Sequence, residues 1–263
     1  MNLDLTGKTA LVCGSSQGIG KAAAHVLADL GAKVVLFARN ANSLQVALND
    51  LPRLDNEEHE ILVADFDQPE QVRTVADKYI NESEHHIDIL INNSGGPPSG
   101  PILEALPSDF LMAIHRHLIC NQLLAQLVVP GMKEKGWGRI VNIISTSVKI
   151  PLENLGVSNT TRGAVASWSK TLASEVGQFN ITVNNVLPGA TDTERLKSII
   201  KNNAEKASLS IDEIAQKMKS TIPVGRFGDP MEIANVVAFL CTHAADYVNG
   251  TSIPVDGGRT KSF

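Results

Sequence analysis

Short apolar runs rich in Val, Ile and Leu alternate with longer segments of helical spacing along almost the whole chain. Most of the short runs are continuously apolar, as expected of strands covered on both faces. Strand–helix alternation of this kind predicts a parallel sheet with helices on both sides. The predicted strands are Thr9–Cys13, Lys33–Ala38, Ile61–Ala64, Asp88–Asn92, Arg139–Ile144, Ile181–Leu187 and Thr251–Val255. The predicted helices are Lys21–Leu30, Gln68–Asn81, Pro107–Lys135, Asn159–Gln178 and Pro230–Thr242.

The chain length suits one large α/β domain or two small ones, because it has 263 residues. No linker, repeat or low-complexity segment divides it, so we predict a single, doubly wound, dinucleotide-binding domain of the Rossmann type over residues 1–263. Residues 194–221 are more polar than their surroundings and lie between two predicted strands. We expect this segment to be a helical insertion that acts as a substrate lid.

Composition and charge exclude several classes of protein. Hydrophobic residues make up 43% of the chain, charged residues 19%, and the net charge is −5, which offers no basic surface for nucleic acid or an anionic membrane. No apolar run approaches the ~18 residues of a membrane span, and Asp4 and Lys8 argue against a secretory signal. The scattered Cys13, Cys120 and Cys241 show neither metal-ligand spacing nor a disulfide pattern. We therefore predict a cytoplasmic protein with no metal site.

A glycine-rich turn follows the first predicted strand and opens the first helix. Gly14 permits a tight turn, Gly18 lets the backbone approach a pyrophosphate, and Gly20 lets the helix lie close to the strand. The free N–H groups and the dipole at the helix N-terminus favour phosphate. The strand before the turn and the helix after it favour a dinucleotide site over an ordinary glycine turn. The candidate binding residues here are Gly14, Ser16, Gln17, Gly18, Ile19 and Gly20.

The end of the second predicted strand indicates which nicotinamide cofactor is bound. An acidic residue at this place would bind the ribose 2′-hydroxyl, but the sequence reads Ala38, Arg39, Asn40. A guanidinium suits a 2′-phosphate, and no carboxylate is present to repel one. Arg39 therefore favours NADP(H) over NAD(H), while a solvated surface arginine is the alternative interpretation. Gln17 adds no charge to this phosphate pocket.

Further motifs carry a family resemblance, and they occur in matching order and spacing. They are Asn92–Gly95, Gly138–Ser145, Asn185–Thr193, Ile222–Pro230 and Ile253–Gly258. Together with the glycine turn, they closely resemble the short-chain dehydrogenase/reductase family, especially its 3-oxoacyl-carrier-protein-reductase-like branch. The resemblance runs from Leu5 to Gly258. It implies a small-molecule carbonyl or alcohol as substrate.

The resemblance also implies cofactor contacts and an assembly. Asp65 and the backbone of Phe66 should face the adenine. Asn92, Ser94 and Gly95 should line the ribose and pyrophosphate path, and Pro188, Gly189, Thr191 and Thr193 should meet the nicotinamide carboxamide. The family pairs its two long central helices and its C-terminal helix and strand, which implies a homotetramer. We expect residues 122–124 and 128–129 and Trp168 to supply apolar surface for it.

The sequence departs from the family at the residues that perform the chemistry. The family places a tyrosine thirteen residues after its serine, and a lysine four beyond that. Here the serine is Ser145, but the tyrosine position is Ser158 and the lysine position is Arg162, while the family's helix asparagine falls on His117. A serine hydroxyl is a far weaker acid than a phenol, and arginine does not shuttle protons. General acid–base catalysis contributes ~10²–10⁴-fold, so its loss predicts a slow enzyme.

Other residues are poor substitutes for the missing acid. The only tyrosines, Tyr79 and Tyr247, lie outside the segments expected at the nicotinamide. Lys149 follows Ser145 closely, but a solvated loop lysine is the simpler interpretation. His117 is a candidate proton relay near neutral pH, although a lone histidine on a helix is more often structural.

Three functions remain open. In the first, an NADP(H)-dependent oxidoreductase uses Ser145 and Ser158 as hydrogen-bond donors to the carbonyl. Arg162 then binds the nicotinamide ribose and holds positive charge near the developing oxyanion, and a water, His117 or the substrate supplies the proton. The second is a cofactor-binding sensor or assembly subunit without turnover. The third is a lyase or isomerase on the same fold. Residues 96–100, 149–157 and 194–221 should form the pocket walls, and their leucines and isoleucines suggest a partly apolar ligand.

Overall fold

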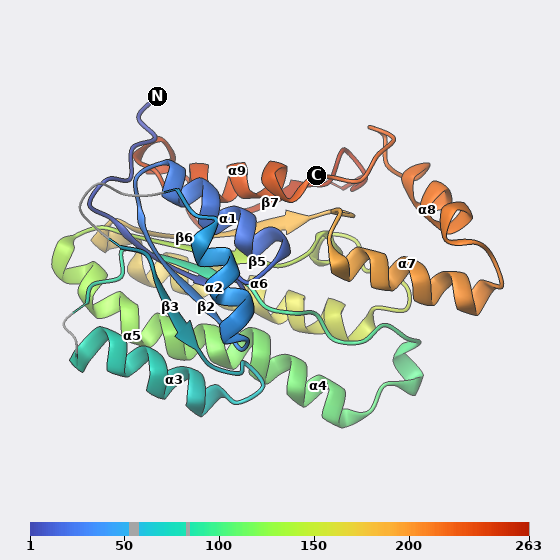
Figure 1. Cartoon of the computed structure of the whole chain (residues 1–263), viewed down its shortest axis with the longest axis horizontal. Helices are drawn as coiled ribbons and strands as arrows, with labels where there is room; N and C mark the ends of the chain where they lie inside the picture. The colour runs from blue at the N-terminus through green and yellow to red at the C-terminus, as the bar shows by residue number, and fades with distance from the viewer. Residues whose placement is uncertain (53–57, 83–84, 263) are drawn as a thin grey trace.

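A seven-stranded parallel sheet forms the centre of the computed structural model, which describes residues 1–52, 58–82 and 85–262. The strand order is β3-β2-β1-β4-β5-β6-β7, the doubly wound arrangement that the alternation predicted (Figure 1). The strands are β1 (Thr9–Cys13), β2 (Lys33–Ala38), β3 (Glu60–Val63), β4 (Ile89–Asn92), β5 (Gly138–Ile143), β6 (Ile181–Pro188) and β7 (Ser252–Val255). Every predicted strand is confirmed to within one residue at each end.

The longer helices cover both faces of this sheet. They are α1 (Gly18–Asp29), α2 (Ala41–Asn49), α3 (Pro69–Asp77), α4 (Pro107–Ile114), α5 (Cys120–Lys135), α6 (Gly156–Val176), α7 (Glu194–Ala207), α8 (Ile211–Lys219) and α9 (Pro230–Leu240). In Figure 1, α1 and α9 lie together on one side of the strands, and α3 and α5 lie on the other. Alternate residues of β1 serve the two faces, since Ala10 and Val12 pack in one apolar cluster and Leu11 and Cys13 in the other.

Helix α2 was not predicted, and its weak apolar pattern explains why. Only Leu44 and Ala47 of this short helix are buried. The Asn40 side chain caps its N-terminus by accepting a hydrogen bond from the Ser43 N–H at 2.9 Å. A cap and two buried side chains are too little for a periodicity argument.

The apolar surface expected on the long helices is only partly accessible, because Leu123, Val129 and Trp168 are half-buried. Leu124 and Val128 are buried in the monomer core, and the Trp168 indole donates to the Gln122 side chain at 2.7 Å, which joins α6 to α5. Four exposed apolar side chains lie instead at the amino-terminal end of this long helical segment: Leu106, Leu111, Met112 and Ile119.

A ladder of polar side chains, which we call the amide ladder, crosses the four strands β4 to β7. Asn92 on β4, Asn142 on β5, Asn185 on β6 and Ser252 on β7 are register partners. Asn92 donates to Asn142 at 2.8 Å, Asn142 to Asn185 at 3.0 Å, and Asn185 to the Ser252 hydroxyl at 3.1 Å. The ladder pairs amides that would otherwise be buried without partners.

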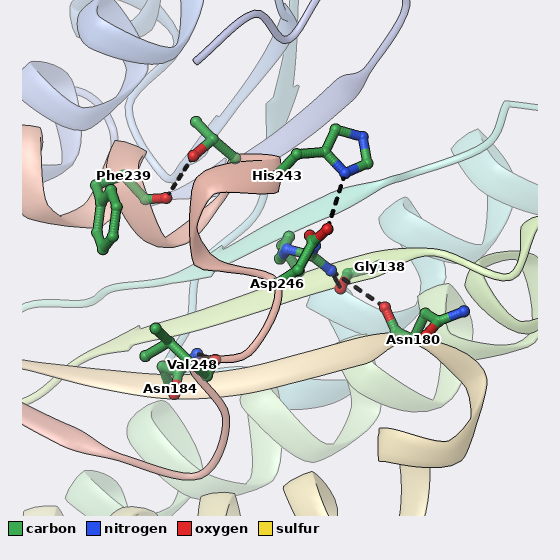
Figure 2. A network of polar contacts seen from close by, with 9 residues as sticks. Gly138, Asn180, Asn184, Phe239, His243, Asp246 and Val248 are labelled. Atoms are coloured by element: carbon green, nitrogen blue, oxygen red, sulfur yellow. Dashed lines mark hydrogen bonds and ion pairs between the residues drawn. The ribbon is translucent and has the colours of Figure 1, made fainter. Parts of the chain in front are cut away.

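A polar network that includes buried Arg139 joins the amino-terminal ends of two strands to the segment after α9. Figure 2 shows Gly138, Asn180, His243 and Asp246 of this network. The Arg139 guanidinium donates to the carbonyls of Gly138 and Asn180 at 2.7 and 3.1 Å, and it pairs with Asp246. His243 contacts the same carboxylate at 3.3 Å. These contacts join the amino-terminal ends of β5 and β6 to the segment that contains the short helix η6 (His243–Ala245).

Candidate functional site

A cavity of about 1540 Å³ opens at the carboxyl ends of the strands, where parallel α/β sheets bind their ligands. We call it the cleft. It is large enough for a dinucleotide together with a small substrate. Most candidate residues line it: Gly14, Ser16, Gln17, Gly18, Ile19, Arg39, Asp65, Phe66, Ser94, Gly95, Ser145, Ser158, Arg162, Pro188, Gly189, Thr191 and Thr193.

Three candidate residues, Gly20, Asn92 and His117, lie outside that lining. A Cβ on Gly20 would come within 2.2 Å of the Gly14 carbonyl oxygen, so this glycine permits the close approach of helix to strand. The Asn92 side chain is turned into the amide ladder. The neighbouring Asn93 lines the cleft instead, and its amide donates to the Gly14 carbonyl at 3.2 Å.

The glycine turn has the geometry that a phosphate site requires. Gly14 and Gly18 both adopt positive φ, +59° and +57°, which favours glycine. A Cβ on Gly14 would lie 2.7 Å from Asn93. Helix α1 begins at Gly18, and no side chain caps its N-terminus, so its first N–H groups face the cleft. These residues fit the pyrophosphate of a dinucleotide.

Arg39 lies at the rim of the cleft, directly after β2. Its side chain is exposed, and among the described residues no carboxylate lies within ion-pair distance of it. The guanidinium is therefore available to an anion beside the glycine turn.

Ser145, Ser158 and Arg162 lie together in the cleft. Ser145 follows β5, and its hydroxyl accepts a hydrogen bond from the Ser147 N–H at 3.1 Å. Ser158 is half-buried in the first turn of α6, and Arg162 follows one turn later. Arg162 is buried and donates through Nη1 to the Ile143 carbonyl at 2.9 Å, while its Nε has no partner among the described residues. Burial, followed by the charges of Arg195 and Arg116, lowers the pKa of Arg162 to about 10, so it is protonated at neutral pH.

His117 lies in a π-helical turn, η3 (His115–Ile119), which joins α4 to α5. Its Nδ1 lies 2.5 Å from the Ser94 hydroxyl, and its Nε2 is buried without a partner among the described residues. Burial and the charges of Arg162 and Arg116 hold the pKa of His117 well below its ordinary range. A lowered pKa disfavours the imidazolium, which argues against a charged proton donor at this position, and the role of His117 as a proton relay stays a prediction. His115 is exposed, on a different face of the helix from His117.

Neither tyrosine of the chain lines the cleft, although the structure describes both. Tyr79 is buried with its ring against His85, and Tyr247 is fully exposed. Lys149 is also exposed and lies outside the lining. The described lining of the cleft therefore contains no phenol that could replace the missing acid.

Two arginines in the cleft were not identified from the sequence. Arg116 on η3 pairs with Asp67 at 2.5 Å and donates to the Gly95 carbonyl at 3.0 Å. Arg195, in the first turn of α7, donates to the Pro97 carbonyl at 2.6 Å. They are far apart in the chain and belong to no motif, so only the fold brings them together.

The walls of the cleft come from the three predicted segments. Gly100 N–H donates to the Asn154 carbonyl at 2.8 Å, which joins the first wall to the second. Helices α7 and α8 lie at the end toward which β6 points (Figure 1), and the prediction that residues 194–221 are helical is confirmed. Leu196, Ile200 and Ile214 form a small core within these two helices.

Comparison with known proteins agrees with this geometry. The family profile described as enoyl-(acyl carrier protein) reductase matches residues 14–260. The 7alpha-hydroxysteroid dehydrogenase of Escherichia coli K12 is 33% identical over 100% of this chain and 98% of its own length. The 3-oxoacyl-(acyl-carrier-protein) reductase FabG of Vibrio cholerae is 33% identical over 97% of this chain and 98% of its own.

A solved structure extends the likeness to a cofactor complex. The L-sorbose reductase of Gluconobacter frateurii, crystallised with NADPH and L-sorbose, matches with a TM-score of 0.92, 32% identity and 100% coverage of both chains. These relatives are oxidoreductases, and the cleft fits the nicotinamide dinucleotide that such enzymes bind. Fold, motifs and relatives agree that the chain belongs to the short-chain dehydrogenase/reductase family.

Proposed function

We propose that this chain is an NADP(H)-dependent oxidoreductase that interconverts a small carbonyl compound and its alcohol through an active site without tyrosine or lysine. The observation that carries the proposal is that one cleft is lined both by the glycine turn and by Ser145, Ser158 and Arg162. Two hydroxyls and a buried guanidinium there provide hydrogen-bond donors and positive charge. These are the groups that stabilise a developing oxyanion.

The cofactor supplies the hydride when it is bound. The Gly14–Gly20 turn and the N-terminus of α1 hold its pyrophosphate. Arg39 binds the 2′-phosphate, because it is exposed at the rim and has no carboxylate partner among the described residues. This contact is the reason that we favour NADP(H) over NAD(H).

The substrate oxygen lies between Ser145 and Ser158 and accepts hydrogen bonds from both hydroxyls. Arg162 keeps its proton and acts as a fixed charge, which also binds the nicotinamide ribose. Because His117 is neutral, it positions Ser94 instead of donating a proton as an imidazolium. A water in the cleft supplies the proton, so turnover should be slow.

The test combines cofactor binding with turnover on one preparation. NADPH binding is followed by fluorescence, and NADPH consumption is measured against a panel of aldehydes and ketones. The double variant Ser158→Tyr, Arg162→Lys should reduce generic carbonyls faster than the native chain, by up to ~10²-fold, because it restores a phenol beside an ammonium. Each single variant should gain less, since the two groups act as a unit.

A folded double variant that binds NADPH but gains no activity would show that the side chains at these positions do not face a reacting carbonyl. NADPH binding without consumption by the native chain on any carbonyl would favour a non-catalytic cofactor-binding protein.

We also propose that the chain works as a homotetramer in the cytoplasm. Leu106, Leu111, Met112 and Ile119 are exposed on the long helical segment through which the family pairs its subunits. All three cysteines are buried and unpaired, as in a reducing compartment. Within the described ranges, no helix has both the length and the apolar character that crossing a membrane requires. Sedimentation at micromolar protein tests the assembly.

A further inference from the structure

Three arginines converge on the part of the cleft beside Ser145 and Ser158, and a carboxylate neutralises only one of them. Arg116, Arg162 and Arg195 come from η3, α6 and α7, and all line the cleft. Arg116 pairs with Asp67. In the described part of the chain, no carboxylate lies within ion-pair distance of Arg162 or Arg195.

The short loop after β4 brings two of these guanidiniums together. Arg116 donates to the Gly95 carbonyl at 3.0 Å, and Arg195 donates to the Pro97 carbonyl at 2.6 Å. The nearest atom to a Cβ built on Gly96 would be Arg195 Nη2, at 3.7 Å. The guanidinium groups of Arg116 and Arg195 therefore both lie along this short stretch of backbone.

Arg162 is the third arginine of the cluster, and it extends from α6 to the end of β5. It is buried, it has one carbonyl partner, and its Nε is unpartnered among the described residues. After burial, the charges that lower the pKa of Arg162 are Arg195 and Arg116, and burial and Arg116 also lower the pKa of Arg195. Arg162 is a buried cation without a counter-ion among the described residues, which is costly, while Arg195 is exposed at the cleft. Such a site favours an anionic ligand.

None of the carboxylates that line the cleft forms an ion pair with Arg162 or Arg195 among the described residues. Glu194, which precedes Arg195, pairs with Lys197 at 2.7 Å. The cofactor phosphates belong to the glycine turn and to Arg39, which follows β2. The loop of residues 93–97 follows β4, which lies beside β1 and two strands from β2, so it is about 10 Å along the sheet edge from Arg39. The 2′-phosphate is therefore too far away to be the anion of the cluster, and the substrate is the source that we consider, with the cofactor as the alternative that the test below separates.

We propose that Arg162 and Arg195 bind a carboxylate of the substrate, which makes the substrate an oxo acid or the corresponding hydroxy acid. Both guanidiniums present several donors, and a carboxylate accepts such donors in pairs. Its carbonyl then lies within the same cleft as Ser145 and Ser158. The inference rests on the proposed function for the position of the reacting carbon. Arg195 lies in the first turn of α7, so a carboxylate bound there also contacts the predicted lid segment.

The test compares acids with their esters. A panel of medium-length 2-oxo, 3-oxo and 4-oxo acids, each beside its methyl ester, is titrated by calorimetry into the protein saturated with NADP⁺. NADPH consumption is measured with the same panel. At least one acid should bind about 10- to 100-fold more tightly than its ester. Arg195→Met should remove this advantage without changing the affinity for the ester or for NADPH.

Lys201→Met is the matched control, because Lys201 is an exposed cation on the same helix and lies outside the cleft lining. It should keep the preference for the acid. Esters that bind as tightly as the acids would overturn the proposal. A loss of NADPH affinity in Arg195→Met that equals its loss of acid affinity would also overturn it, by assigning Arg195 to the cofactor.

The proposed function and this inference fail in different ways. Acids that bind through Arg195 but are not reduced would refute the redox function and leave the carboxylate site. Neutral ketones that are reduced as well as any acid would keep the redox function and refute the carboxylate site.

Discussion

Arg39→Ala should weaken NADPH binding and leave NADH binding nearly unchanged. Hydrogen bonds between charged partners contribute about 1.5–3 kcal/mol where they are shielded from water. The Arg39 side chain is exposed at the rim of the cleft. Solvent screening should therefore reduce its contribution to the binding free energy to about 1–1.5 kcal/mol, below that of a shielded pair. The expected change in the NADPH dissociation constant is therefore about 5- to 12-fold.

Fluorescence titration with both cofactors measures this effect. Salt provides a second readout, since the Debye length falls to about 3 Å at 1 M ionic strength. High salt should bring the NADPH affinity of the native chain close to that of the variant. Arg73→Ala is the control, because Arg73 is exposed on α3 and lies outside the cleft lining.

Two results would refute the reasoning. Equal affinities of the native chain for NADPH and NADH would remove the role of Arg39. An equal loss for both cofactors in Arg39→Ala would mean that the residue supports the rim of the site and does not bind the 2′-phosphate.

Three further predictions follow from burial and packing. Because the pKa of His117 is well below its ordinary range, the rate should show no histidine inflection between about pH 6 and 8; an inflection there that His117→Asn abolishes would contradict this. Asn142→Leu leaves one buried donor and one buried acceptor unpaired, which should lower the free energy of unfolding by about 1–3 kcal/mol in urea, after allowance for the apolar gain. Gly20→Ala places a Cβ 2.2 Å from the Gly14 carbonyl oxygen. It should lower the free energy of unfolding by about 1–3 kcal/mol and should also weaken NADPH binding. The control is Gly163→Ala in α6, whose Cβ would meet no described atom within 4 Å beyond the backbone of its own helix and its chain neighbours, and it should not lower the free energy of unfolding in the same denaturation series.

The sheet could be predicted from the sequence because buried parallel strands appear as continuous apolar runs. The β1 segment Thr9–Cys13 and the β2 segment Lys33–Ala38 match their predicted bounds at both ends. The glycine turn could be recognised for a similar reason, since Gly14 and Gly18 need a backbone conformation that few other residues adopt. Local chemistry decides both features.

Features that depend on tertiary contacts could not be predicted in this way. Asn92 belongs to a motif associated with the cofactor, but its amide is paired with Asn142 on the next strand. The cluster of Arg116, Arg162 and Arg195 exists only because η3, α6 and α7, which are far apart in the sequence, line one cleft. The lowered pKa of His117 follows from burial and then from the charges of Arg162 and Arg116, and neither cause is visible in the sequence of the helix.

The amide ladder has a consequence for how the sheet chooses its register. When strands are apolar on both faces, sliding one strand past another exchanges one buried aliphatic side chain for another, so the hydrophobic pattern barely opposes a slip. Asn92, Asn142 and Asn185 change this balance, because a slip by a single residue leaves their amides unpaired in an apolar interior. Each orphaned amide costs about 1–3 kcal/mol. The three asparagines therefore favour one register of β4, β5 and β6 over its neighbours. This register aligns the ends of the strands, from which the loops around the cleft begin.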